Sequence, residues 1–356
     1  MKRRYLFGII VLVFGGLFAF ACGDDDETGG EQFAFGLRAE TVVADGFADN
    51  VSAIAFAPDG RIFFAEQIKG TIRIIEADGT LQTEPFTQIA VADWLGQDWG
   101  LTGLALDPSF DANHFVYAFY TEFVRTVSFT DEAGELKEHA VGQPKIVRMT
   151  EVNGRNQDLA LISDDFPETS DFAPGYNANG ELHFGPDGFL YASVGDYDLF
   201  DKDVTAITDL GTPVGKLLRM TKDGAAAAGN PFEDDETADP RIFAYGFREP
   251  FSFAFSATGS LYGTDNTTVS CEELNVIDEG SYYGWPEMGE FPFDNCFAAP
   301  GNQAIHYFSR EGLEPNAFIS FVEVSGLSFL SGSPYELLGD SLIVCEGHKG
   351  PSADGT

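Results

Sequence analysis

One local pattern recurs along the chain: an apolar run meets a tight turn, and a second run rich in Tyr, Phe, Val and Leu follows. It occurs five times, in segments 54–67, 104–122, 182–196, 253–266 and 327–347. Three of the turns have proline at the first corner, where its fixed φ suits the turn: Pro58, Pro108 and Pro186. Gly60 and Gly188 supply the positive φ that such turns require. Each segment is therefore predicted to be a β-hairpin.

The spacing of these hairpins predicts an all-β fold. Successive turns are separated by about 50 to 80 residues, which leaves room for a four-stranded sheet and loop insertions in each unit. The sequence shows no amphipathic helix of about ten residues between them. A β-propeller fits the repeated turn best, and two stacked β-sandwiches are the alternative. A protein of 356 residues, 44% of them hydrophobic, is able to bury a large core.

The N-terminus is typical of an exported protein. Three basic residues precede an apolar run that ends at Cys22, so residues 1–21 are expected to be a signal peptide. Cys22 is expected to be the lipidated first residue of a bacterial lipoprotein, and the acidic, glycine-rich residues 22–40 a flexible tether. The residues before Cys22 depart from the usual lipoprotein pattern, which leaves a non-lipidated signal peptide or an uncleaved anchor as alternatives. The folded domain, residues 41–356, is expected in the periplasm or at the cell surface, attached to the membrane only through the lipid.

The charge balance excludes one class of partner. The chain has 20 Lys and Arg against 57 Asp and Glu, a formal net charge of −37. Such a surface repels nucleic acid. A solvated acidic surface also suits an exported protein, so the charge itself does not indicate a substrate.

Three cysteines follow Cys22, and their pairing is open. In an oxidising compartment Cys271 and Cys296 would close a loop, with a stabilisation of about 3 kcal/mol. Cys345 would then be a buried thiol, or it would pair with a cysteine beyond Thr356. We expect the Cys271–Cys296 disulfide.

Six stretches occur in an order that matches a known family. They are GLTGLALDPSFDANHFVYAFYT, NGELHFGPDGFLYASVGD, VGKLLRMTKDG, FAYGFREP, EELN and YYGWPE. In this order they resemble the glucose/sorbosone dehydrogenase family over roughly residues 45 to 350. That family folds as a six-bladed propeller and uses pyrroloquinoline quinone with calcium. The resemblance implies a quinone-dependent aldose dehydrogenase with a sugar substrate and an external electron acceptor.

Asn177 and Asp196 lie at almost equal distances before and after the turn at Asp187. An antiparallel hairpin that turns there places both residues at the same open end. In a propeller that end can face the axial mouth, where polar groups from several blades line one site. The catalytic residues are therefore expected at this end.

In the family the position of Asn177 is normally histidine, oriented by the carboxylate that corresponds to Asp196. Imidazole can accept the proton of a sugar hydroxyl, and an amide cannot. Asn177 is expected to position the sugar, and Asp196 to act as the base, with a pKa raised by acidic neighbours. The structural alternative for Asp196 is an Asx turn before Tyr197. The alternative function is a non-catalytic propeller that binds a sugar, a glycan or a protein partner.

The cofactor contacts are expected in the YGFREP segment, where the family has Gly-His-Arg-Asn-Pro. Arg248 corresponds to the arginine that holds the quinone carboxylates, and a guanidinium suits that role. Glu249 replaces an amide and would neutralise Arg248 in a loop ion pair, the structural alternative. Pro250 ends the segment. Asp265, an acidic residue at a strand end, is the fourth residue expected at the cofactor.

The remaining candidates are interpreted mainly as structural. Glu272 is placed at the site with Asp265, whereas Glu273 and Asn275 are expected to pin the loop before the YYGWP turn. Acidic runs at 196–203 and 233–240 offer oxygen ligands for calcium, but neither has EF-hand spacing. The last hairpin ends close to the C-terminus, so the sixth blade is expected to be incomplete and the protein to be truncated at its C-terminal end.

Overall fold

The structure is a computed structural model. It describes residues 11–12, 50–92, 99–130, 134–169, 176–199, 204–266, 272–286, 301–302, 304–308, 322–330 and 341–348. Cys22, the tether at 22–40 and the predicted Cys271–Cys296 disulfide lie outside these residues, as does all of the signal peptide except Val11 and Leu12. None of the helices in the described ranges is long and apolar enough to cross a membrane.

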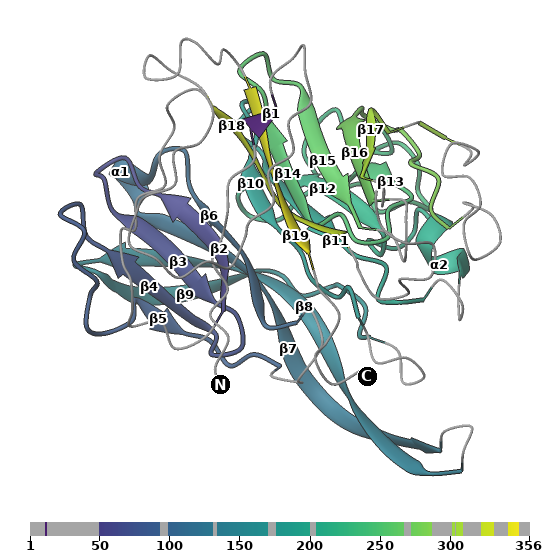
Figure 1. Cartoon of the computed structure of the whole chain (residues 1–356), viewed down its shortest axis with the longest axis horizontal. Helices are drawn as coiled ribbons and strands as arrows, with labels where there is room; N and C mark the ends of the chain where they lie inside the picture. Colours follow the sequence, from purple (N-terminus) through teal and green to yellow (C-terminus); the bar gives the residue numbers. More distant parts are fainter. Residues whose placement is uncertain are drawn as a thin grey trace.

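The described residues form consecutive antiparallel sheets (Figure 1). The first sheet contains β2 (Val51–Phe56), β3 (Ile62–Glu66), β4 (Thr71–Ile75) and β5 (Thr87–Gln88). The second contains β6 (Leu101–Leu106), β7 (Phe115–Thr130), β8 (Leu136–Val152) and β9 (Arg155–Ser163). The third contains β10 (Leu182–Phe184), β11 (Leu190–Val194), β12 (Lys216–Met220) and β13 (Ile242–Tyr245). The fourth contains β14 (Ser252–Phe255), β15 (Leu261–Asp265), β16 (Glu272–Ile277) and β17 (His306–Phe308).

A fifth sheet follows, in which β19 (Ser341–His348) lies between β18 (Val322–Leu330) and β1 (Val11–Leu12). In the four preceding sheets each strand pairs with the next strand along the chain, the meander that defines a propeller blade. The structure therefore confirms an all-β propeller. A count of six blades stays a prediction.

The five predicted hairpins are all present, and one turn differs from the expectation. Gly60 and Gly188 have φ of 89° and 81°, as the tight turns require. After Pro108, however, the chain forms the short helix α1 (Phe110–Asn113), which His114 ends in the left-handed conformation. The buried ring of Phe110 packs in the core between the first and second sheets, which explains why this turn is longer. A second short helix, α2 (Val204–Thr208), precedes β12.

The core lies between neighbouring sheets, because successive side chains of a strand point to opposite faces. Phe63 and Val116 pack between the first and second sheets, and Phe119 and Leu190 between the second and third. Tyr191, Leu217, Phe253 and Leu261 join the third sheet to the fourth, and Leu274, Phe308, Leu327 and Val344 join the fourth to the fifth. Each fully buried side chain of this size contributes about 1.5 to 3 kcal/mol.

Two surfaces depart from this regular packing. The outer halves of β7 and β8 pair only with each other, from Phe123 opposite Gly142 to Thr130 opposite Leu136, and project from the body (Figure 1). On β2, Ala53 and Ala55 face the second sheet, whereas Ile54 and Phe56 are 51% and 74% exposed on the other face. Strand β2 therefore exposes two apolar side chains on this face.

Candidate functional site

Polar residues from several connections meet at one place in the fold, which we call the Asp196 cluster. Its members are Asn177, Asn179, Asp196, Arg248, Glu249, Asp265 and Trp285. Asn177 and Asn179 precede β10, Asp196 follows β11, and Arg248 and Glu249 link β13 to β14. Hydrogen bonds connect all of these segments, so sequence-distant residues form one site.

Asn177 and Asp196 meet as the hairpin geometry predicts. The Asn177 Nδ2 donates to Asp196 Oδ1 at 2.9 Å, and the two residues are 2% and 0% exposed. Asn177 has φ of 59°, a left-handed conformation that asparagine tolerates better than most residues. Gly195 lies against its backbone, and a Cβ there would overlap the Asn177 carbonyl. The backbone thus fixes the amide in place.

Asp196 is more enclosed than the sequence indicates. Its Oδ1 also accepts the backbone N–H of Asp198 at 2.8 Å, and its Oδ2 accepts the indole N–H of Trp285 at 2.9 Å. Burial is the main reason that its pKa is raised, and the Arg248 charge and these donors oppose the rise. We expected acidic neighbours to raise it instead. The bond to Asp198 is the local contact of an Asx turn, so the structural alternative also holds.

Asp265 pins the segment that carries Arg248 and Glu249. Its carboxylate accepts the backbone N–H of Arg248 at 3.1 Å and that of Glu249 at 2.7 Å. Burial raises its pKa to about 6. Asp196 contributes from the other side, since its N–H donates to the Arg248 carbonyl at 2.7 Å. The predicted cofactor segment and the predicted catalytic pair are therefore one structural unit.

The Arg248 guanidinium shows how the site would hold an anion. Its Nη1 donates to the Asn266 carbonyl at 3.0 Å, and its Cζ lies 5.9 Å from the centre of the Trp285 ring. Within the described part of the chain, its Nε is buried without a hydrogen-bond partner. A buried, unpartnered charged donor fits one carboxylate of an anionic cofactor. Buried Pro250 follows directly after Glu249.

Glu249 does not pair closely with Arg248. The nearest Arg248 nitrogen lies 3.9 Å from Glu249 Oε2, the outer limit of an ion pair. Glu249 Oε1 instead accepts Asn179 Nδ2 at 3.0 Å. The sequence prediction did not include Asn179. Its position two residues after Asn177 was the signal that could have placed it at the site. The sequence prediction also missed the indole bond of Trp285, which is 1% exposed.

Glu273 and Asn275 lie inside the fold beside the cluster. Glu273 stands opposite Asp265 on the paired strands β15 and β16, and its Oε2 accepts Asn275 Nδ2 at 3.1 Å. Burial and the Asp265 charge raise the Glu273 pKa to about 8. Glu272, on the same strand, is 4% exposed. The role expected for Glu273 and Asn275, to pin the loop before the YYGWP turn, stays a prediction.

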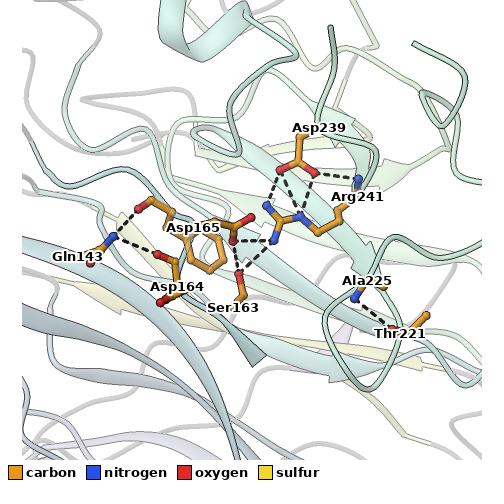
Figure 2. Close-up of polar contacts among 9 residues, drawn as sticks. Gln143, Ser163, Asp164, Asp165, Thr221, Ala225, Asp239 and Arg241 are labelled. Atoms are coloured by element: carbon orange, nitrogen blue, oxygen red, sulfur yellow. Dashed lines mark hydrogen bonds and ion pairs between the residues drawn. The ribbon is translucent and has the colours of Figure 1, made fainter. Parts of the chain in front are cut away.

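The acidic run at 233–240 serves a different purpose. In the described residues no group of three or more His, Cys, Asp or Glu side chains is placed to hold a metal ion. Asp239 instead binds the Arg241 guanidinium, which also contacts Asp165 at 2.9 Å and Ser163 at 3.1 Å (Figure 2). A groove of about 500 Å³ opens beside these residues. Because its charged side chains are bound to one another, we interpret it as a clamp between sheets.

The sequence model of the family described as Glucose / Sorbosone dehydrogenase matches residues 48–346. The quinoprotein glucose dehydrogenase B of Acinetobacter calcoaceticus is 26% identical over 297 residues, which are 77% of this chain and 59% of that protein. The mouse Hedgehog-interacting protein is 26% identical over 71% of this chain and 38% of its own length. The chain thus spans little more than half the length of the first of these relatives, and less of the second.

Solved structures agree with the fold. The glucose dehydrogenase-like oxidoreductase of Thermus thermophilus superposes with a TM-score of 0.62 at 28% sequence identity. The superposition covers 82% of this chain and 76% of that one.

Proposed function

This chain belongs to the glucose/sorbosone dehydrogenase family, and from that premise we propose that it is an exported sugar dehydrogenase. It would oxidise a hydroxyl of an aldose with pyrroloquinoline quinone as the hydride acceptor and pass the electrons to an external acceptor. The observation that supports this proposal is the buried Arg248 Nε, which has no hydrogen-bond partner in the described residues. Such a donor matches a carboxylate of the quinone.

Different residues of the cluster would bind the quinone and the sugar. Arg248 would hold the quinone, and the Trp285 ring beside its guanidinium would cover a planar or sugar face. The quinone, when bound, supplies the two-electron oxidation. Asn177 turns its Nδ2 toward Asp196, which leaves its Oδ1 to accept a hydrogen bond from a sugar hydroxyl. Asp196 fixes that orientation and so acts as a positioning residue.

A specific observation favours a second candidate, a non-catalytic propeller that binds a sugar, a glycan or a protein. The position that is normally histidine in the family is Asn177, which cannot accept a proton, and Asp196 is completely buried. The relatives include a protein named for an interaction with Hedgehog. A binding propeller would have no use for a quinone site.

The test is a titration of quinone, with and without calcium, into the purified protein without its signal peptide, followed by absorbance and then by dye reduction with an aldose panel. The dehydrogenase predicts saturable quinone binding and sugar-dependent dye reduction. Arg248→Gln should weaken quinone binding at least about tenfold, since one charged hydrogen bond contributes about 1.5 to 3 kcal/mol. Arg125→Gln, on the projecting hairpin, is the matched control. A folded protein that binds sugar but no quinone would contradict the dehydrogenase and support the non-catalytic binding propeller.

The export proposal is tested separately. Cys22→Ser should release the protein from the membrane fraction if Cys22 carries the lipid, whereas an uncleaved anchor would keep it there. Calcium remains a prediction of the family resemblance, and a loss of quinone binding in a chelator is the result that would support it.

A further inference from the structure

The oxidation of a sugar hydroxyl requires a group that takes the hydroxyl proton, and the Asn177–Asp196 pair does not supply one. The Asn177 amide has no basic lone pair at neutral pH. Asp196 is 0% exposed, and three donors, from Asn177, Asp198 and Trp285, already occupy its two oxygens. A substrate hydroxyl would have to displace one of them to reach it.

Other carboxylates lie close to Asp196, and they differ in how deeply they are buried. Asp265 is 1% exposed and is held by the backbone N–H groups of Arg248 and Glu249. Glu273 is 3% exposed and lies on β16, behind Asp265. Glu249 is 8% exposed, the least enclosed carboxylate of the group. It also stands in the same segment as Arg248, the residue that would bind the oxidant.

We propose that Glu249 is the proton acceptor of this site. It would perform the role that Asn177, at the position where the family has histidine, cannot perform. The inference rests on the dehydrogenase function proposed above. In the step, the O–H bond of the sugar breaks and its proton moves to the Glu249 carboxylate. A bound quinone would supply the two-electron oxidation by accepting the C–H hydride with its electron pair, and the sugar carbon would reach the carbonyl level.

One side-chain hydrogen bond and one backbone hydrogen bond hold Glu249 in the cluster. Asn179 Nδ2 donates to Oε1 at 3.0 Å, which orients the carboxylate plane. The Glu249 backbone N–H is tied to Asp265 Oδ1 at 2.7 Å, so the residue cannot move away from the cluster. Of the charged groups in the cluster, Arg248 Nη1 lies 3.9 Å from Glu249 Oε2, Asp265 accepts the Glu249 backbone N–H, and the Asp196 N–H donates to the Arg248 carbonyl. The base would thus sit between the arginine of the oxidant site and the segment that carries the sugar-positioning amide.

Glu249→Gln tests the proposal, because glutamine keeps an oxygen for Asn179 and removes the basic carboxylate. We expect kcat to fall at least about 100-fold, the usual effect of losing a general base, with KM for the sugar changed less than about threefold. The acid limb of the pH–rate profile should disappear. Glu151→Gln is the matched control: it removes another buried glutamate paired with an arginine, Arg61, between the first two sheets.

Sugar binding gives a readout that does not need turnover. The fluorescence of Trp285, whose indole belongs to the cluster, should report sugar binding. The affinity of the wild-type protein should change with pH because the sugar would bind beside an ionisable carboxylate, and the affinity of the Glu249→Gln variant, which lacks that carboxylate, should not follow this change. A pH-independent affinity in the wild type would overturn the proposal even if the protein proved inactive.

The outcomes separate this inference from the function on which it rests. If the wild-type protein oxidises sugar and Glu249→Gln retains its kcat, Glu249 is not the base and the dehydrogenase stands. If Glu249→Gln loses kcat and Asn177→His in that background restores at least about tenfold, the role of Glu249 as the missing base is supported. If the wild type neither binds quinone nor oxidises sugar, the dehydrogenase fails, and the fluorescence measurement alone decides whether the Glu249 carboxylate affects sugar binding.

Discussion

At the scale of single residues, the Asp196 cluster holds several carboxylates and one guanidinium in a space from which water is largely excluded. Asp196, Asp265 and Glu273 all have raised pKa values, and burial is the first cause in each case. The single cation of the cluster, Arg248, compensates only part of this charge. The free energy of unfolding should therefore respond to pH through these carboxyl groups.

Glu273→Gln should make the protein more stable at pH 8 and change little near pH 4.5. The pKa of Glu273 is about 8 in the fold and near its ordinary value of 4.5 when unfolded, so the folded protein holds the proton more tightly. Its stabilisation is complete below pH 4.5 and is lost as the pH rises toward 8, with a slope of up to about 1.4 kcal/mol per pH unit. Urea unfolding of both proteins at pH 5 and pH 8 measures the difference. Equal wild-type and variant stabilities at pH 8 would contradict the raised pKa.

Gly195→Ala should disrupt the site without removing a polar side chain. A Cβ at residue 195 would overlap the Asn177 carbonyl, which belongs to backbone and cannot swing away. We expect a loss of about 1 to 3 kcal/mol of stability and weaker sugar binding. Gly79→Ala is the control for the effect of replacing glycine on the entropy of the unfolded chain, because nothing lies within 4 Å of a Cβ there. Its φ of 85° adds backbone strain in the alanine variant. Unchanged sugar binding in Gly195→Ala would show that Asn177 is not held by this contact.

At the scale of strands and turns, the sequence predicted the hairpins well because each turn depends on local chemistry. Proline and glycine at fixed places determine the turn before any tertiary contact forms. The same hairpin logic placed Asn177 next to Asp196. The contacts of Asn179 with Glu249 and of Trp285 with Asp196 span 70 and 89 residues, and no local pattern encodes them. The depth of Asp196 escaped prediction for the same reason.

The clamp at Arg241 joins elements that are far apart in sequence. Its guanidinium binds Asp239 just before β13 and reaches Ser163 and Asp165 at the end of β9. Arg241→Met should lower the free energy of unfolding by about 3 to 5 kcal/mol, because Asp239 would remain buried without its cation. Arg125→Met removes an exposed ion pair with Glu168 and should cost less than about 1 kcal/mol. Chemical denaturation compares the two, and equal effects would mean that the clamp contributes no more than a surface pair.

At the scale of the whole molecule, the first sheet is notable for the two exposed apolar side chains of β2. Ile54 and Phe56 expose apolar surface on the face turned away from the second sheet. Contiguous exposed apolar surface favours association. The overall charge of −37 opposes association at low salt, because copies of the protein repel one another.

Phe56→Ser should therefore reduce self-association in high salt and leave stability almost unchanged. The Phe56 side chain is 74% exposed, so its replacement removes few contacts of the folded protein. Phe64→Ser, on the neighbouring strand, removes a ring that is 2% exposed and should cost about 3 to 5 kcal/mol. Light scattering across a salt series and thermal unfolding measure the two effects. A Phe56→Ser variant that associates as strongly as the wild type would place the association surface elsewhere.

The bond between Trp285 and Asp196 also has a consequence for how the protein matures. Trp285 follows all the strands of the first three sheets in the sequence, so one of the donors to the Asp196 carboxylate is the last part of the site to be synthesised. Burial of that charge waits for a segment 89 residues further along. Assembly of the site is thus a late event in folding, dominated by non-local contacts. A ligand that binds at the Asp196 cluster would stabilise only molecules in which Trp285 and Asp196 are already in contact, so it would favour the last step of folding.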